Sequence, residues 1–193
     1  MPVTSLALGC ALAAAMVTLT GCGNERTRPP DAVTPAAPRG RQPVSSPAAG
    51  VSFTAPANWR VDEQIEGSRV ATVNSSRATV AVWRYQREEP LPHGKHELER
   101  ARTALLERIM RRDPTFQSAS TDVTKVAGKS AIQVLGAETI AGIRVRVRSA
   151  HVFADGAEIV VDAYAPPEHF TRLDATVFQP LLRSLRLSRP APR

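Results

Sequence analysis

Residues 77–86 constrain the fold of this chain more than any other segment. When they are extended, alternate side chains point to opposite faces, and both resulting sets are largely apolar. The two sets are Thr79, Ala81, Trp83 and Tyr85, and Ala78, Val80 and Val82. A strand that avoids water on both faces belongs at the centre of a sheet covered on both sides. The sequence therefore predicts a central strand with further structure packed above and below it.

Periodicity outlines the other elements. Alternating apolar residues predict strands at 51–56, 68–73, 116–126, 130–139, 143–153 and 158–164. Apolar residues recur at helical spacing within 97–112, with Pro114 just beyond, which predicts an amphipathic helix. A final helix carries the apolar residues of 178–185 and is started or kinked by Pro180. This order of strands, helix, strands and helix indicates an α+β domain.

The N-terminal residues predict a location. Residues 1–21 contain no charged side chain, and their apolar run at 6–19 is shorter than the ~20 residues of a transmembrane helix, so we expect a signal peptide. The run ends in Leu-Thr-Gly-Cys at residues 19–22, which resembles a bacterial lipobox. The resemblance implies cleavage before Cys22, acylation of its thiol, and lipid anchoring at the outer face of the cell membrane. The alternative is a plain secretory signal in which Cys22 is incidental.

Composition divides the rest of the chain into a tether, a folded domain and a short tail. Residues 23–50 contain six prolines and five alanines without a hydrophobic period, so 22–50 is expected to be the lipidated cysteine and a tether. A domain at 51–188 and a tail at 189–193 follow. Cys10 and Cys22 are the two cysteines. Removal of the signal peptide and acylation of Cys22 would leave none for a disulfide or a zinc-thiolate site.

Few residues offer catalytic or metal-binding chemistry. His93 and His96 stand beside Glu97 at a spacing that one metal could bridge. An exposed helix start is favoured over a metal site because no matching carboxylate follows. His151 is in register with apolar neighbours, which favours a core histidine bonded to a neighbour over a general base. No serine lies in a nucleophile elbow. We therefore expect no catalytic residue, no metal and no cofactor.

Arg144, Arg146 and Arg148 alternate with apolar residues and form the most distinctive polar pattern. On a strand they project from one face about 7 Å apart. Three guanidinium groups in a row could bind phosphate or carboxylate, including lipid headgroups. A ladder of ion pairs with acids on neighbouring strands is the favoured alternative. The net charge of +7 is weak support for an acidic partner, and nucleic acid is not expected outside the membrane.

The hairpin at Asp155 and Gly156 decides the register of these arginines. A two-residue loop would place Ile159 and Val161 on the face of the arginines, mixing apolar and charged groups. A three-residue turn at 154–156 avoids this mixture and is therefore predicted.

The predicted register separates the three arginines. Asp162 then lies opposite Arg148, and the same reasoning at 140–142 sets Glu138 opposite Arg144. Arg146 faces Gly136 and Tyr164 without an acid. We therefore predict that Arg146 is the arginine most available to an anionic partner.

Several short segments resemble one known fold family. They are residues 51–56 followed by Trp59, the long helix after the third strand, the turn at 126–129, and the closing 178–187 with Ser184-Leu185. Together they are similar to the PsbP-like fold, and especially to LpqN-type actinobacterial lipoproteins. The resemblance implies a central antiparallel sheet of about six or seven strands with helices on both faces, an α/β/α sandwich. We expect the domain to be monomeric.

The family resemblance implies a noncatalytic binding or accessory subunit in envelope assembly or transport. An envelope protein or an anionic lipid would be its partner. Two alternatives stay open. A lipid or small-molecule carrier would need a cavity between sheet and helix. An enzyme would need a cleft where titratable groups converge.

Overall fold

The computed structural model describes residues 34–63 and 67–191. The predicted signal peptide, Cys22 and the first part of the tether lie outside these residues. The elements are β1 (Gln42–Ser46), a 3₁₀ turn (Pro47–Ala49), β2 (Val51–Ala55), β3 (Arg60–Asp62), β4 (Arg69–Ser75), β5 (Ala78–Gln86), α1 (Gly94–Arg112), β6 (Gln117–Val126), β7 (Lys129–Ile140), β8 (Ile143–Ala154), β9 (Ala157–Ala165), α2 (Pro167–Leu173), a π-helical turn (Asp174–Phe178), α3 (Gln179–Ser184) and β10 (Arg186–Leu187). Within the described residues, no helix is both long and apolar enough to cross a membrane.

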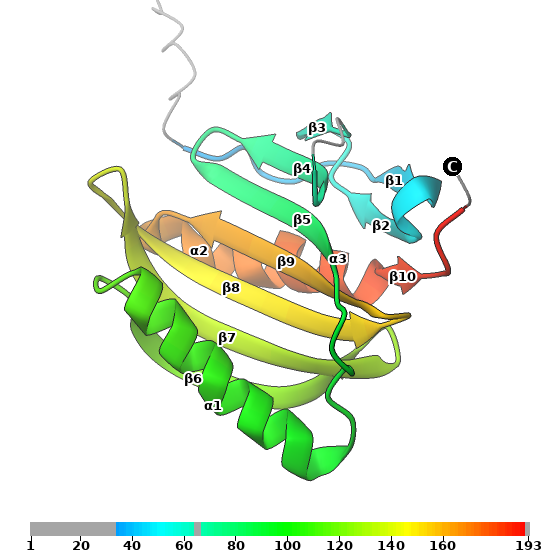
Figure 1. Cartoon of the computed structure of the whole chain (residues 1–193). Coiled ribbons are helices and arrows are strands. Elements are labelled where there is room, and N and C mark those ends of the chain that lie inside the picture. The colour runs from blue at the N-terminus through cyan, green and yellow to red at the C-terminus, as the bar shows by residue number, and fades with distance from the viewer. Residues whose placement is uncertain (1–33, 64–66, 192–193) are drawn as a thin grey trace, which may run out of the picture. The chain divides into compact units, whose positions relative to one another are not determined.

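The strands form two antiparallel sheets (Figure 1). The larger sheet has seven strands in the order β3-β4-β5-β9-β8-β7-β6, and the smaller has three in the order β1-β2-β10. The predicted central strand is β5, with β4 and β9 on either side. Helix α1 packs over β6 and β7 on one face of the larger sheet, whereas α2 packs over β8 and β9 on the other. The predicted α+β architecture, with helices on both faces of an antiparallel sheet, is confirmed.

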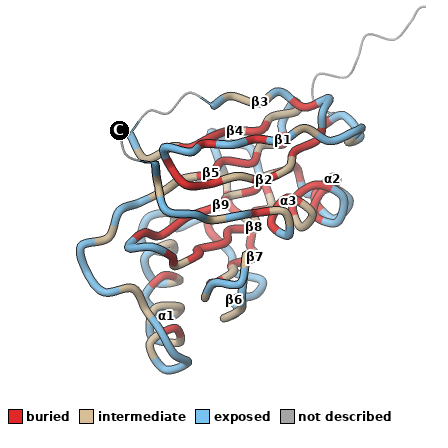
Figure 2. Tube along the Cα trace, turned by 90° about the vertical axis from the view of Figure 1, so that its right-hand side faces the viewer, coloured by how far each residue is buried: buried red, intermediate tan, exposed pale blue. Residues whose placement is uncertain are grey.

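The main core lies on the α2 and α3 side of the larger sheet (Figure 2). It joins apolar residues of β4, β5, β8 and β9 to those of α2, α3 and the smaller sheet. A smaller cluster under α1 includes Leu105, Phe116 and Val147. The π-helical turn comes directly before α3, whose second residue is Pro180, so the expected interruption of the last helix is also present. One face of β5, with Ala78, Val80 and Val82, is buried, whereas the other face is only partly covered, since Trp83 is half-buried and Tyr85 is exposed.

The predicted hairpin register is wrong. Both hairpins that bound β8 have two-residue turns, so Ala154 pairs with Ala157 and Ile140 pairs with Ile143. The first residue of each turn has a positive φ, +49° at Ala141 and +48° at Asp155, and a glycine with positive φ follows. This combination is the type I′ turn that matches the right-handed twist of two strands. Turn geometry therefore prevails over a clean separation of apolar and charged residues.

The observed register places Arg148 opposite Ala163, and Ser149 opposite Asp162. Arg148 and Asp162 consequently lie on opposite faces of the sheet, and Arg144 faces Thr139 rather than Glu138. This sheet face carries both arginines and apolar residues. It tolerates Arg148 because the guanidinium forms an ion pair with Asp174 in the π-helical turn, with Nε to Oδ1 at 2.5 Å and NH2 to Oδ2 at 2.8 Å. A partner from a helix thus replaces the cross-strand partner that was expected.

The predicted tether is too long. Val44 is 2% exposed and pairs with Phe53, so β1 belongs to the folded domain. Farther upstream, Ala36 donates its backbone N–H to Ser75 Oγ at 2.9 Å and accepts from Trp59 Nε1 at 3.1 Å. The expectation of no regular structure through residue 50 is therefore wrong for 42–49. Alternation within Gln42–Ser46 is masked by Pro43 and by Pro47 just beyond it, although Pro43 stands in an edge strand, which tolerates proline.

Candidate ligand-binding site

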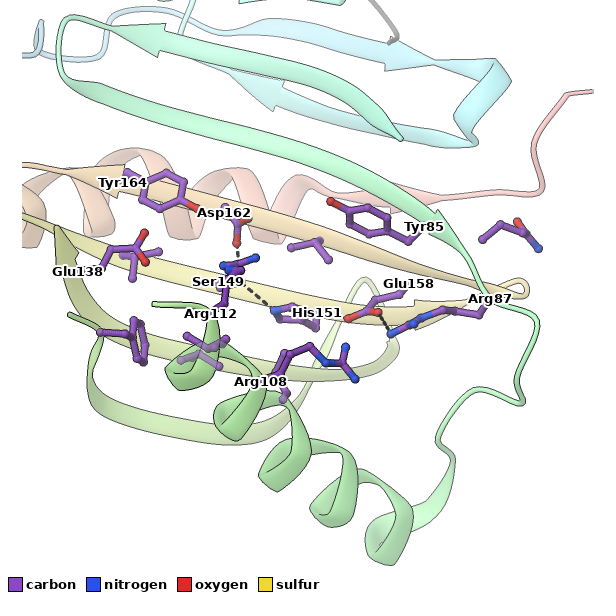
Figure 3. Close-up of a pocket in the computed structure, with 17 residues that line it drawn as sticks. Tyr85, Arg87, Arg108, Arg112, Glu138, Ser149, His151, Glu158, Asp162 and Tyr164 are labelled. Atoms are coloured by element: carbon purple, nitrogen blue, oxygen red, sulfur yellow. Dashed lines mark hydrogen bonds and ion pairs between the residues drawn. The ribbon is translucent and has the colours of Figure 1, made fainter. Parts of the chain in front are cut away.

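A cavity of about 390 Å³ lies between α1 and the face of the larger sheet formed by β5, β9, β8 and β7 (Figure 3). Its apolar wall comes from α1 and from the sheet, through Leu105, Ile109, Phe116, Val134, Val147 and Val160. Because α1 packs over β6 and β7, the neighbouring face of β8, β9 and β5 is left partly uncovered. The volume falls within the range of small-molecule sites, about 300–1,000 Å³.

A glycine in β7 shapes one end of this cavity. A Cβ atom at Gly136 would lie 2.5 Å from Phe116 Cζ and 2.8 Å from the Gln117 carbonyl oxygen. Only a residue without a side chain leaves room for the Phe116 ring to lie against the sheet. Phe116 is 7% exposed and contributes to the cavity wall. The absence of a side chain at Gly136 thus allows the Phe116 ring to occupy its place in the cavity wall.

A continuous chain of polar side chains crosses the sheet side of the cavity. Ser149 Oγ donates to Asp162 Oδ1 at 2.6 Å and lies 3.0 Å from His151 Nε2. His151 Nδ1 lies 2.6 Å from Glu158 Oε1, and Arg87 donates to the other oxygen of Glu158. Alternation along β8 and β9, in the observed register, brings Ser149, His151, Glu158 and Asp162 to one face.

This polar chain gives both imidazole nitrogens of His151 a hydrogen-bond partner. The hydroxyl proton of Ser149 points to Asp162, so Ser149 Oγ can accept from His151 Nε2. His151 Nδ1 faces the Glu158 carboxylate. Burial raises the pKa of Glu158, but the hydrogen bond and charge of His151, followed by those of Arg87, outweigh burial and leave this pKa lowered.

Burial raises the pKa of two further groups in the wall. Burial, followed by the nearby Asp113 carboxylate, raises the pKa of Glu138. Burial likewise raises the pKa of Tyr164, and the charges of Asp162 and Glu138 raise it further. Tyr164 is therefore a stable hydroxyl donor at physiological pH.

Helix α1 adds Arg108 and Arg112 to the cavity lining (Figure 3). Among the residues that the structure describes, neither forms an ion pair with a carboxylate. On the sheet side, Arg87 pairs with Glu158, and Asp162 accepts from Ser149. The two arginines therefore concentrate positive charge at the α1 side of the cavity. The cavity can thus bind an anionic group beside an apolar surface.

The order Ser149, His151, Glu158 has the residue types of a hydrolase triad, but the geometry does not support nucleophilic catalysis. Ser149 lies in the middle of β8, where it pairs with Val134 on one side and with Asp162 on the other. The surrounding backbone N–H groups are used in these strand ladders, whereas acyl transfer needs N–H donors directed at a developing oxyanion. The hydroxyl itself is bonded to Asp162. This row of polar side chains is therefore suited to binding a ligand.

The residues predicted from sequence do not form one site. Arg144, Arg146 and Arg148 lie on the sheet face opposite the cavity, each with a different partner. Arg144 donates to Gln117 Oε1 at 2.5 Å, Arg146 lies 5.2 Å from the centroid of the Phe170 ring, and Arg148 pairs with Asp174. Arg146 thus has no acidic partner among the described residues, although it is less exposed than Arg144. Its selection as the anion-binding arginine stays a prediction.

The three histidines singled out in the sequence lie in two kinds of environment: His93 and His96 at the exposed start of α1, and His151 inside the sheet. His93 and His96 are exposed, and each contacts a residue of α1: His93 Nδ1 lies 3.2 Å from Glu97 Oε2, and His96 Nδ1 lies 2.5 Å from Arg100 NH1. Within the described residues, no three His, Cys, Asp or Glu side chains are grouped to hold a metal. His151 is 9% exposed and bonded to its neighbours, which confirms the core-histidine interpretation.

Sequence reasoning missed the cavity because it depends on the register. A signal was present: Ser149 and His151 alternate on one strand, as do Glu158, Asp162 and Tyr164 on the next. With the Asp-Gly sequence at 155–156 taken as a two-residue turn, these sets face each other. The three-residue turn instead set them on different faces.

Comparison with known proteins identifies the fold. No protein-family model and no curated protein matches the chain. Among solved structures, it is similar to cyanobacterial PsbP (CyanoP) from Synechocystis sp. PCC 6803, with a TM-score of 0.59, 9% identity, and coverage of 79% of this chain and 95% of that one. It is also similar to the Ran-binding protein Mog1p of Saccharomyces cerevisiae, with a TM-score of 0.53 and 10% identity. This match covers 77% of the present chain and 96% of Mog1p.

LpqN of Mycobacterium tuberculosis, described as involved in cell envelope biogenesis, is also similar. Its TM-score is 0.52 at 14% identity, and the match covers 80% of this chain and 90% of LpqN. Identities this low establish the shared fold and leave function to the site itself. The chain has a PsbP-like fold, shared with CyanoP and with the envelope protein LpqN.

Proposed function

We propose that this chain is a lipid-anchored protein of the outer face of the cell membrane that binds an amphipathic anion, an acyl chain bearing a carboxylate or a phosphate. It acts without catalysis, as an accessory protein in envelope assembly or transport. The lipobox at residues 19–22 supports the anchor. The similarity to LpqN supports a role in the envelope.

One observation carries the ligand class: the same cavity has an apolar wall and two guanidinium groups that form no ion pair with a carboxylate of residues 34–63 or 67–191. Ile109, Phe116 and Val160 can pack against a hydrocarbon chain, whose burial contributes about 0.8 kcal/mol per methylene. Arg108 and Arg112 can hold the charged end by charge-assisted hydrogen bonds. The polar chain from Arg87 to Asp162 has internal partners, so it forms a fixed wall.

Displacement of a fluorescent acyl probe tests this proposal. Dansyl-undecanoate is mixed with the mature chain carrying Cys22→Ala, and dodecanoate or dodecanol is added as competitor. We expect probe binding, displacement by dodecanoate, and much weaker displacement by dodecanol because the alcohol lacks the charge. Absence of probe binding would refute the proposal, and equal displacement by both competitors would refute the role of the arginines.

Neighbouring residues of α1 provide matched controls. Ile109→Trp places bulk in the cavity, whereas Met110→Trp adds the same bulk at a side chain that is 53% exposed. Arg112→Gln removes a charge at the cavity, whereas Arg111→Gln removes one that pairs with Glu107 on the exposed side. Only the first variant of each pair is expected to weaken probe binding, by about tenfold or more.

A further inference from the structure

The β7–β8 hairpin ends in an exposed apolar tip. Ile140 and Ile143 face each other across the turn and are 45% and 41% exposed. Only four large hydrophobic side chains of the described residues are exposed, and these are two of them. Two exposed apolar side chains paired at a hairpin tip indicate a surface that meets a partner.

The hairpin projects beyond the rest of the sheet (Figure 1). The pairing of β8 with β9 stops at Arg146 and Ala165, and the pairing of β6 with β7 stops at Gln117 and Ala137. Residues 138–140 and 143–145 therefore pair with each other alone. The loop after α1 supports the hairpin at this level, because Thr139 donates its backbone N–H to Thr115 Oγ1 at 2.9 Å.

The N-terminal segment enters the domain at the same end of the sheet. Ala36 is bonded to Ser75, at the end of β4. In the sheet, Thr79 pairs with Tyr164, and Tyr164 pairs with Val147, close to the start of β8. The turn after β4 and the β7–β8 hairpin thus lie at one end, and Figure 1 shows both there beside the start of the described chain.

The length of the intervening chain lets this end reach the membrane if Cys22 is the anchor. Residues 23–33, eleven in all, separate Cys22 from Thr34. Eleven residues reach at most about 40 Å when fully extended and roughly 18 Å as a flexible coil. A chain of this length permits the hairpin end to contact the bilayer.

Charge at this end fits an anionic surface. Arg144 adjoins the tip and is exposed, as are Arg77 in the turn after β4 and Arg112 at the end of α1. Of the acids near them, Glu168 is exposed, Asp113 is half-buried and Glu138 is buried, so arginine is in excess among these exposed side chains. Apolar side chains that enter the headgroup region together with basic residues that bind anionic lipids are the features of interfacial membrane contact.

We propose that the tip at 140–143 inserts into the headgroup region of an anionic phospholipid bilayer, with Ile140 and Ile143 among the acyl chains and Arg144 at the lipid phosphates. This inference rests on the lipid anchor of the proposed function. The inserted tip is a second attachment that fixes the orientation of the cavity relative to the membrane.

A fluorophore at the tip tests the insertion. In the lipidated mature chain, Cys22 is acylated, so Ala141→Cys introduces the single free thiol, which is labelled with NBD. The control is Asp155→Cys, in the equivalent two-residue turn at the other end of β8. Both proteins are reconstituted in vesicles of phosphatidylcholine with one third phosphatidylglycerol and collected by flotation.

In floated vesicles, we expect blue-shifted NBD emission at position 141, quenched by spin-labelled lipid, and aqueous emission at position 155. Ile140→Ser with Ile143→Ser should shift the emission at 141 back to the aqueous value. Aqueous emission at 141 in a chain that floats would overturn the insertion and leave the anchor intact. Failure of the wild-type chain to float would refute the anchor, and the insertion with it.

Discussion

Replacing Glu158 with glutamine tests the charge arrangement of the cavity. The Glu158 side chain is 8% exposed and accepts from His151 on one oxygen and from Arg87 on the other. A glutamine has the same shape but presents one acceptor and one donor. If its oxygen stays with Arg87, its N–H₂ group faces His151 Nδ1 as a donor. The variant therefore removes the negative charge and replaces an acceptor by a donor opposite His151 Nδ1.

The expected cost follows from burial. Removing one partner of a buried ion pair costs about 3–5 kcal/mol. Arg87 keeps 32% of its side-chain surface in solvent, so screening reduces the loss to about 2–3 kcal/mol. Glu107→Gln is the matched control, because its pair with Arg111 is 3.7 Å long and more than half exposed on both sides. That pair is worth about 0–1 kcal/mol.

Urea unfolding of the mature chain and ¹⁵N NMR of the His151 ring measure the two effects. Because the pKa of Glu158 is lowered, its stabilisation is complete above the ordinary value of 4.5 and is lost as the pH falls through the lowered one. The difference in unfolding free energy between wild type and Glu158→Gln should therefore shrink below about pH 4.5. Equal losses for Glu158→Gln and Glu107→Gln at pH 7 would refute the reasoning.

Three further substitutions follow from the structure. The raised pKa of Glu138 means that its ionised form is disfavoured in the folded chain, so Glu138→Gln should raise the melting temperature at pH 7 and lose this advantage by pH 4; an advantage that is independent of pH would contradict this. Gly136→Ala should destabilise the domain by about 1–3 kcal/mol in urea and weaken probe binding, since its Cβ would displace Phe116; unchanged values would show that the ring is free to move. Wild-type chain should partition into detergent, whereas Cys22→Ala should stay in the aqueous phase or remain unprocessed, and a soluble wild type with a free thiol at Cys22 would exclude the anchor.

Periodicity was sufficient to predict six strands of the larger sheet, β4 to β9, but not the short β3. The double apolar pattern of 77–86 correctly predicted a central strand, and the spacing of Leu98, Leu105 and Ile109 correctly predicted α1. These patterns are local, so they do not depend on which segments meet. β1 was missed because Pro43 and Pro47 outweigh one buried valine in a composition-based argument.

The candidate site depended on information that periodicity does not contain. Asp174 pairs with Arg148 from a helical segment, and such a partner cannot be found by aligning neighbouring strands. A one-residue change in the hairpin reverses the facing of every side chain on β9 relative to β8. The positive φ that Asp155 and Gly156 adopt was the decisive local property, and it favours the two-residue turn.

The most direct test of ligand binding uses the protein from its own membrane. Wild type and Ile109→Trp are extracted in mild detergent and compared by native mass spectrometry, with Met110→Trp as the control. We predict a bound acyl anion on wild type and on Met110→Trp, at a mass that fatty-acid or phospholipid analysis identifies, and its loss from Ile109→Trp. Ligand-free wild type, or the same adduct on all three proteins, would contradict the assignment of the cavity under α1 as the binding site.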